Sequence, residues 1–259
     1  CAIVRKREYQ KTQDEYMGRE RKRGAILEAA GYLKSGTGDF YFSSGEISEL
    51  VGIKYILAVD IDTEPYLGSV DELLGIILHP ANSPVIKEGR VIKGFGILAP
   101  RLVTRLKDSI LGAFSMAKGG IGSVSGYDME SSDFWQEVFG RASFCGKGLI
   151  SVDALIACTS WLPEDRILSH DILEGELTGC AYAGGTIFTE GFPGSPSSYY
   201  KRLHRWIRGD TQNLRLLFLA RLDCLAKIKL LDNLIRAVAP ASVLAAMYLS
   251  FLIYPAAGS

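Results

Sequence analysis

Two carboxylates one residue apart, Asp60 and Asp62, directly follow the apolar run at 54–59. Such a run is typical of a buried parallel strand, and ligands of open α/β sheets bind where strands end. Both carboxylates are therefore expected to reach one site. Because Mg²⁺ takes oxygen ligands and shares them with phosphates, the pattern predicts a metal–diphosphate anchor. The alternative is a solvated turn, which carries the same residue types.

A second candidate centre lies at Asp171, which is expected to begin a helix over 171–178. Glu174 stands one helical turn further along, and His170 directly precedes Asp171. A carboxylate in this position can act as general base on a sugar hydroxyl. The residues alone leave a second interpretation open, in which the acidic side chains only stabilise the positive end of the helix dipole.

Arginines alternate with a tryptophan later in the chain, at Arg202, Arg205, Trp206 and Arg208. A tryptophan ring stacks on a sugar or a base, and arginine side chains bind a diphosphate. The group is therefore a candidate substrate-binding element. A basic helix beside a membrane has the same composition, so the pattern leaves both interpretations open.

Lysines next to glycines form two further candidates. Lys22 and Gly24 stand at an expected helical joint, where a phosphate can approach the backbone, or where the charges are only solvated. Gly146-Lys147-Gly148 has neither the spacing nor the Ser/Thr of a P-loop. The second stretch is therefore not predicted to be a nucleotide-binding loop.

Helices and strands are expected to succeed one another over the first two thirds of the chain. Apolar periodicity predicts helices over 13–33, 70–78, 101–117, 132–138, 149–158 and 171–178. The first of these begins at the capping-box sequence Thr12-Gln13-Asp14-Glu15. Apolar and β-branched runs predict strands over 54–59, 91–98 and 181–189. This order indicates the α/β class.

Composition excludes several classes of protein. The 259 residues contain 29 Lys and Arg against 29 Asp and Glu, and this zero net charge argues against a dedicated nucleic-acid binder. A content of 47% hydrophobic and 22% charged residues excludes a disordered chain. The five cysteines contain no CxxC pair, so neither a disulfide framework nor a structural zinc site is expected.

The last third of the chain changes character. Between 201 and 236 there are nine Lys or Arg and three Asp. One helical face carries Leu217, Ala220, Cys224, Ile228, Leu231 and Ile235, and the opposite face carries Arg215, Arg221, Lys229, Asp232 and Arg236. The pattern predicts an amphipathic helix over 213–236 that lies on an anionic membrane surface. A helix packed on the domain is the alternative.

Residues 237–259 contain no charged side chain and approach the length that a spanning helix needs. They predict one transmembrane helix, with a buried core helix as the alternative. Positive charge before the span and none after it puts the globular part, residues 1–212, in the cytoplasm. Because the chain begins with Cys and ends soon after the apolar segment, it is expected to be part of a longer protein.

In their order along the chain, these motifs resemble the glycosyltransferase domain of cyclic β-1,2-glucan synthases, a branch of the processive family-2-like glycosyltransferases. The stretches that carry the resemblance are 16–24, 60–63, 94–101, 144–148, 168–175, 204–210 and 231–234. Arg202 stands where cellulose-synthase-like enzymes have Gln, and Ser169-His170-Asp171 replaces their Thr-Glu-Asp string. Both departures favour the cyclic-glucan branch.

The resemblance implies a GT-A-like α/β fold, here truncated at the N-terminus, and an inverting transfer of glucose from UDP-glucose with Mg²⁺ or Mn²⁺. Asp60 and Asp62 would hold the donor diphosphate through the metal, and Lys22 would neutralise its charge. Asp171 would be the catalytic base that deprotonates the glucan acceptor.

The remaining expected substrate contacts also follow from the resemblance. His170 and Glu174 would orient Asp171 or contact the acceptor. Arg205 and Trp206 would line the donor–acceptor junction, and Arg202 and Arg208 would lie nearby. The resemblance further implies the bacterial inner membrane, a cytoplasm-facing catalytic part, and the rest of a multidomain synthase as partner. The alternatives are another processive polysaccharide synthase of this fold, or a non-catalytic nucleotide-sugar or glycan-binding module.

Overall fold

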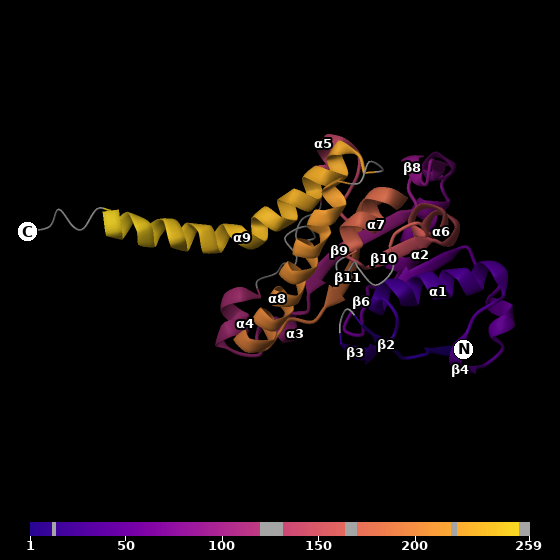
Figure 1. The fold of residues 1–259 in the computed structure, drawn as a ribbon. Helices are drawn as coiled ribbons and strands as arrows, with labels where there is room; N and C mark the ends of the chain where they lie inside the picture. Colours follow the sequence, from indigo (N-terminus) through magenta and orange to yellow (C-terminus); the bar gives the residue numbers. More distant parts are fainter. Residues whose placement is uncertain (12–13, 120–131, 164–169, 219–221, 254–259) are drawn as a thin grey trace, which may run out of the picture.

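The fold is built around a mixed β-sheet of five strands (Figure 1). The computed structural model describes residues 1–11, 14–119, 132–163, 170–218 and 222–253. In spatial order the strands are β5 (Tyr55–Ala58), β10 (Gly148–Ser151), β9 (Ile97–Thr104), β11 (Cys180–Glu190) and β6 (Glu64–Pro65). β9 and β11 are parallel, and the other neighbours are antiparallel. The predicted α/β class, with a mixed sheet flanked by helices, is confirmed.

Helices cover both faces of this sheet. Side chains of a strand point alternately to opposite faces, so consecutive residues of β9 enter different cores. Ile97 packs in one buried cluster with α1 (Arg21–Ser35) and α6 (Val152–Thr159). Leu98 packs in another with α2 (Ser69–Leu78). Each fully buried side chain of this size stabilises the fold by about 1.5–3 kcal/mol, and together they fix the sheet that carries the site.

The other elements of the described chain surround this core. The further helices are α3 (Leu106–Ser109), α4 (Ala113–Lys118), α5 (Phe134–Phe139), α7 (Asp171–Thr178), α8 (Pro196–Asn213) and α9 (Cys224–Ile253), with 3₁₀ turns at Ile47–Leu50, Pro80–Asn82 and Leu214–Phe218. Two-stranded sheets pair β1 (Ala2–Arg5) with β4 (Phe40–Ser44), β2 (Glu8–Gln10) with β3 (Glu15–Met17), and β7 (Val85–Lys87) with β8 (Arg90–Lys93).

The first helix begins later than its sequence predicts. Residues 15–17 form β3, which pairs with β2, and α1 starts at Arg21. Thr12 and Gln13 of the expected capping box lie outside the described residues. Glu20 takes a left-handed conformation at the helix start with no capping hydrogen bond from its side chain. The capping-box interpretation is therefore wrong, because strand pairing outweighs the local helix signal.

The structure differs from the helices and strands predicted between residues 91 and 158, because of glycine geometry and strand pairing. The strand expected at 91–98 is divided at Gly94, whose φ is +70° and whose Cβ would lie 2.1 Å from the carbonyl oxygen of Ser83. Residues 101–104 continue β9 rather than starting a helix, and two short helices follow. The segment expected as a helix over 149–158 begins as β10 before α6.

The C-terminal region differs from the predicted pair of helices. Of residues 213–236, Asn213 ends α8, Leu214–Phe218 form a 3₁₀ turn, and α9 begins at Cys224 and continues without a break past 237. Ala220 and Arg221 of the predicted helix lie outside the described residues. Lys229, expected on the polar face, is 1% exposed, whereas Ile228 and Ile235 of the expected apolar face are 44% and 63% exposed. The packed face of α9 is therefore rotated from the predicted one, since this part of the helix packs on α7 and α8.

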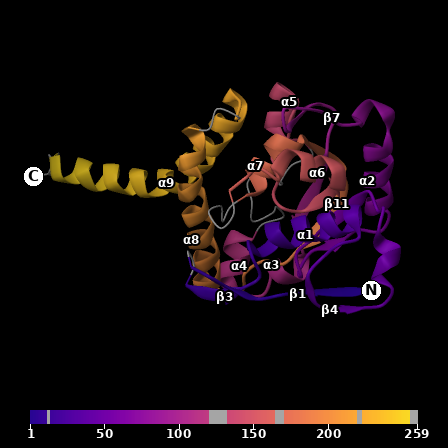
Figure 2. The same cartoon turned by 45° about the vertical axis from the view of Figure 1, so that its right-hand side comes forward.

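The second half of α9 leaves the domain and projects away from it (Figure 1; Figure 2). Residues Cys224–Phe251 are long and apolar enough to cross a membrane, with a mean hydropathy of 1.6 in an 18-residue window, none of which is buried. Length and composition thus agree with the predicted membrane helix.

Candidate active site

The carboxylate of Asp60 lies between two lysine ammonium groups. Lys22 Nζ donates to Asp60 Oδ1 at 2.5 Å, and Lys147 Nζ lies 3.5 Å from Asp60 Oδ2. Lys147 Nζ also donates to Glu190 Oε2 at 2.6 Å. The Glu190 side chain is buried and that of Lys147 is 13% exposed, whereas 43% of the Asp60 side chain is exposed. An accessible carboxylate is thus held beside a largely buried ion pair.

Strand register brings these residues together. β10 is antiparallel to β5, and Gly148 pairs with Ala58, so the chain that enters β10 from Lys147 lies beside the chain that leaves β5 toward Asp60. β11 runs in the same direction as β5, which brings its last residue, Glu190, to the same edge of the sheet. The predicted parallel pairing of 54–59 is therefore wrong, because the apolar run marks a strand but does not set its direction.

The pKa of Asp60 reflects the two ammonium groups. Burial raises this pKa, but the hydrogen bond and charge of Lys22, helped by Lys147, outweigh burial and lower it below its usual value. Burial would lower the pKa of Lys147, yet Glu190 and Asp60 raise it. Asp60 and Lys147 are therefore both charged at neutral pH.

Asp62 supplies a second carboxylate at this edge. It is half-buried, and its Oδ2 faces the backbone of Gly191, where a Cβ would lie 3.1 Å away. Carboxylate oxygens are the ligands that suit Mg²⁺ and Mn²⁺, and Mg²⁺ is commonly bound by one or two carboxylates together with phosphate oxygens. Asp60 and Asp62 therefore fit such an ion, provided that Asp60 exchanges a lysine contact for it.

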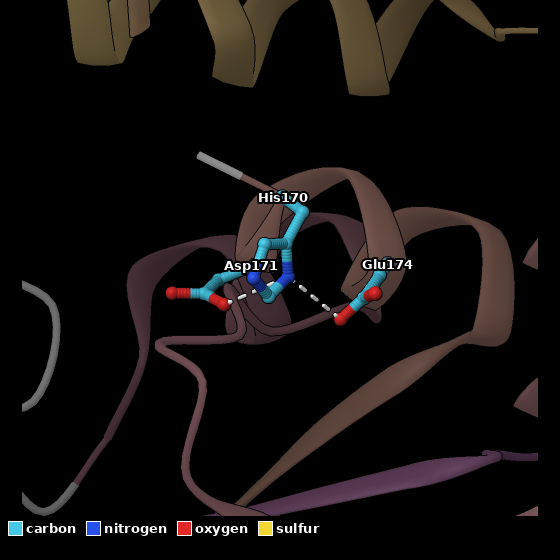
Figure 3. Close-up of side chains that lie close together, drawn as sticks. All are labelled: His170, Asp171 and Glu174. Carbon is cyan, nitrogen blue, oxygen red and sulfur yellow. Dashed lines mark hydrogen bonds and ion pairs between the residues drawn. The ribbon is translucent and has the colours of Figure 1, made fainter. Parts of the chain in front are cut away.

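Asp171 lies at the start of α7, in a cluster with His170 and Glu174 (Figure 3). His170 Nδ1 is 3.2 Å from Asp171 Oδ1 and 3.0 Å from Glu174 Oε2. His170 and Glu174 are buried, while 37% of the Asp171 side chain is exposed. The arrangement orients one accessible carboxylate by a buried imidazole and a second carboxylate.

The charges of this cluster follow from its burial. Burial lowers the pKa of His170, but Glu174 and Asp171 outweigh this and raise it to about 9. Burial raises the pKa of Asp171, and the positive charge of His170 offsets only part of the increase. At neutral pH His170 is therefore an imidazolium that donates to carboxylates.

The same three residues offer ligand atoms within 4.8 Å of one another, which is close enough to hold a metal ion. In the structure His170 Nδ1 is hydrogen-bonded to Glu174 Oε2 at 3.0 Å, and Glu174 Oε1 faces Arg23 Nε at 3.7 Å. These observations favour a hydrogen-bonded cluster over a metal centre at His170.

A buried arginine holds this cluster against α1. Arg23 is 2% exposed, and its Nη1 donates to Glu20 at 2.8 Å. It also pairs with Glu174 and lies 3.5 Å from the backbone oxygen of Thr159 at the end of α6. Removing one member of such a buried charge group leaves another unpaired, so its geometry is strongly constrained.

Gly146 connects the two clusters. Its φ is +79°, and a Cβ at this position would lie 2.8 Å from Asp171 Oδ2. The next residue, Lys147, contacts Asp60. Lys22 and Asp60 both contribute to the electrostatic environment of Asp171. The candidate base and the candidate diphosphate anchor therefore adjoin the same short segment.

The predicted arginine and tryptophan contacts lie on α8. The guanidinium of Arg202 is 6.0 Å from the ring of Trp206, which is 38% exposed, and Arg205 and Arg208 are exposed. Within the described ranges, no hydrogen bond or ion pair joins Arg202, Arg205 or Trp206 to either carboxylate cluster. The substrate contacts expected of α8 stay predictions.

Three residues of the site were not predicted as site residues. Lys147 and Glu190 meet Asp60 only through the pairing of distant strands, and Arg23 meets Glu174 through helix packing. The glycines on both sides of Lys147 were the available signal. A Cβ at Gly148 would lie 2.1 Å from the carbonyl oxygen of Leu98, which shows how tightly this segment is fixed.

A comparison with curated proteins gives the class of this domain: it is a glucan synthase-related domain. In an alignment of 254 positions that covers 94% of the chain, it is 35% identical to cyclic beta-(1,2)-glucan synthase NdvB of Rhizobium meliloti (strain 1021). The match covers 9% of the length of that protein. No protein-family model matches the chain.

Proposed function

We propose that this chain is the glycosyltransferase domain of a larger synthase and transfers glucose from UDP-glucose to a growing β-1,2-glucan with inversion. The observation that carries the proposal is the position of Asp171. This accessible carboxylate adjoins Gly146, and the next residue contacts Asp60 between two lysines. The relationship to a cyclic beta-(1,2)-glucan synthase supports the β-1,2-glucan product, and a GT-A-like fold agrees with the mixed sheet.

The reaction needs a base on one side and charge neutralisation on the other. Asp171 accepts the proton of an acceptor hydroxyl as its oxygen bonds to the anomeric carbon of glucose. The bond from that carbon to the diphosphate breaks, and the electron pair leaves with UDP. Lys22 neutralises part of the negative charge that develops there. Asp60 and Asp62 would hold Mg²⁺ or Mn²⁺, which would supply further neutralisation of the diphosphate.

The cluster around Asp171 prepares the base. The His170 imidazolium orients the carboxylate through Nδ1, which lies 3.2 Å from Asp171 Oδ1 and 3.0 Å from Glu174 Oε2. Because Glu174 is buried and paired with Arg23, the orientation depends on the contact between α1 and α7. Arg202, Arg205, Trp206 and Arg208, in the proposal, bind donor or acceptor sugar along α8.

The membrane part of the proposal rests on α9. Its second half is apolar and exposed, and it follows a helix rich in Arg and Lys. We infer that this half spans the bacterial inner membrane, with the catalytic part on the cytoplasmic side where UDP-glucose is available. The rest of a multidomain synthase is the proposed covalent partner.

The proposal is tested with membranes that contain the full-length protein. Radiolabelled UDP-glucose is supplied with Mg²⁺, with and without EDTA, and the glucan is analysed for its linkage. Metal-dependent incorporation into a β-1,2-linked product is expected. Another linkage would assign the domain to a different processive synthase. UDP binding without any incorporation would contradict the catalytic proposal and favour a nucleotide-sugar-binding module.

A further inference from the structure

We propose that Lys147 couples metal binding to diphosphate binding at Asp60: it holds Asp60 while the site is empty and contacts the diphosphate once the metal is present. The inference rests on the proposed function, because it takes Asp60 as a metal ligand and a nucleoside diphosphate as part of the donor. It adds a positioning role for Lys147 and Glu190, which the sequence prediction did not include.

The geometry gives Lys147 one permanent partner and one exchangeable partner. Its Nζ is 2.6 Å from Glu190 Oε2 but 3.5 Å from Asp60 Oδ2. Glu190 is buried, so its contact with the ammonium is shielded from solvent, whereas the Asp60 side chain is 43% exposed. An ion that binds Asp60 therefore competes with Lys147 for the carboxylate and leaves the pair with Glu190 in place.

The charges at the site explain why metal and diphosphate would bind together. Lys22 and Lys147 carry two positive charges, and Asp60, Asp62 and Glu190 carry three negative charges. A divalent cation that arrives alone puts two more positive charges beside two ammonium groups, and charge repulsion at such short range opposes it. A diphosphate brings the compensating negative charge and gives the displaced ammonium a new acceptor.

The backbone on both sides of Lys147 is tightly constrained. Gly146 and Gly148 both have positive φ angles, of +79° and +148°, and Cβ atoms at these positions would approach neighbouring groups within 2.8 Å and 2.1 Å. A change of partner by Lys147 therefore involves its side chain rather than its backbone.

The test measures binding and needs no turnover. Mn²⁺ affinity of the full-length protein is determined by electron paramagnetic resonance, with and without UDP, for wild type and variants. Lys147→Met removes the charge and Lys147→Arg keeps it. Glu190→Gln removes the partner that competes with Asp60 for the lysine. Lys34→Met is the matched control. It also removes a lysine charge, but Lys34 forms an exposed ion pair with Asp153, which is not one of the site residues.

In wild type, UDP is expected to raise the Mn²⁺ affinity at least about tenfold, and by reciprocity Mn²⁺ raises the affinity for UDP equally. Lys147→Met tightens Mn²⁺ binding without UDP by about tenfold and reduces the gain that UDP causes. Glu190→Gln has the opposite effect on Mn²⁺ alone, because Lys147 then stays on Asp60. Lys147→Arg and Lys34→Met resemble wild type.

Two results would overturn the inference. One is unchanged or weaker Mn²⁺ binding by Lys147→Met when its UDP binding with Mn²⁺ shows an intact site. The other is equal Mn²⁺ affinity of wild type with and without UDP. If glucose transfer from UDP-glucose is still observed, only the role of Lys147 fails. If neither transfer nor Mn²⁺ binding is found, the proposed function fails with it.

Discussion

Replacing Lys229 by Met is expected to weaken the packing of α9 on α7 severely. Lys229 Nζ contacts Glu176 Oε1 and donates to the carbonyl oxygens of Arg141 and Ala142 at 3.0 and 3.2 Å. Lys229 and Glu176 are only 1% and 2% exposed. Loss of the ammonium leaves a buried carboxylate without this counter-charge, which costs about 3–5 kcal/mol. For a chain of this size, that lowers the unfolding midpoint by about 6–20 °C.

Thermal unfolding in detergent, followed by tryptophan fluorescence, measures this effect. Trp135 is a local reporter, because its ring is 5.5 Å from Lys229 Nζ. The double variant Lys229→Met/Glu176→Met should be more stable than Lys229→Met, since no buried charge is left unpaired. Lys227→Met, two residues away on the same helix, is the control and should change stability by at most about 0.5 kcal/mol. A Lys229→Met variant as stable as Lys227→Met would refute the reasoning.

The same change should depend on pH. Burial raises the pKa of Glu176, and Lys229 opposes that increase. Without Lys229 this carboxyl can become neutral by binding a proton, so the loss of stability in Lys229→Met should be smaller at about pH 5 than at about pH 8. An equal loss at both pH values would contradict an electrostatic origin.

Three further predictions concern the site. Because the pKa of His170 is raised to about 9, the stability that His170 contributes is complete below about pH 6.5 and is lost as the pH rises through about 9. Transfer rates should fall over the same alkaline range, and His170→Asn should remove this pH dependence. Asp62→Ala should weaken UDP binding with Mn²⁺ but not with EDTA, which isothermal titration calorimetry measures; equal weakening in EDTA would exclude a metal-specific role. Gly146→Ala should lower kcat about 10–100-fold with little change in UDP affinity, because its Cβ would displace the Asp171 carboxylate; unchanged kcat would mean that this contact has no role.

Local sequence patterns predicted the positions of helices and strands better than they predicted which segments pack or pair with one another. The apolar run at 54–59 is β5, and α7 has the bounds expected from sequence. The direction of β5 could not be predicted, because an apolar run is compatible with either orientation and only the pairing with β10 decides it. Likewise, helical periodicity assigned Lys229 to a polar face, although Glu176 and two carbonyl groups allow it to be buried.

The same contrast holds for the candidate site: residues within one short motif were predicted, whereas contacts between distant segments of the chain were not. Asp60 and the cluster of His170, Asp171 and Glu174 were predicted from short motifs, since each motif follows one strand or begins one helix. Lys147 could not be predicted, because Gly146-Lys147-Gly148 fits no nucleotide-binding motif and its contact with Asp60 depends on strand register.

The central claim is that Asp171 is the base of a glucosyl transfer. The most direct measurement compares wild type, Asp171→Asn and the exposed-carboxylate control Asp153→Asn in the same membranes, with transfer from UDP-glucose and UDP affinity measured in parallel. The account predicts that Asp171→Asn lowers transfer about 10²–10⁴-fold while UDP affinity stays within about twofold of wild type, since the base acts in the transition state. Asp153→Asn should behave as wild type. Normal transfer by Asp171→Asn would contradict the account.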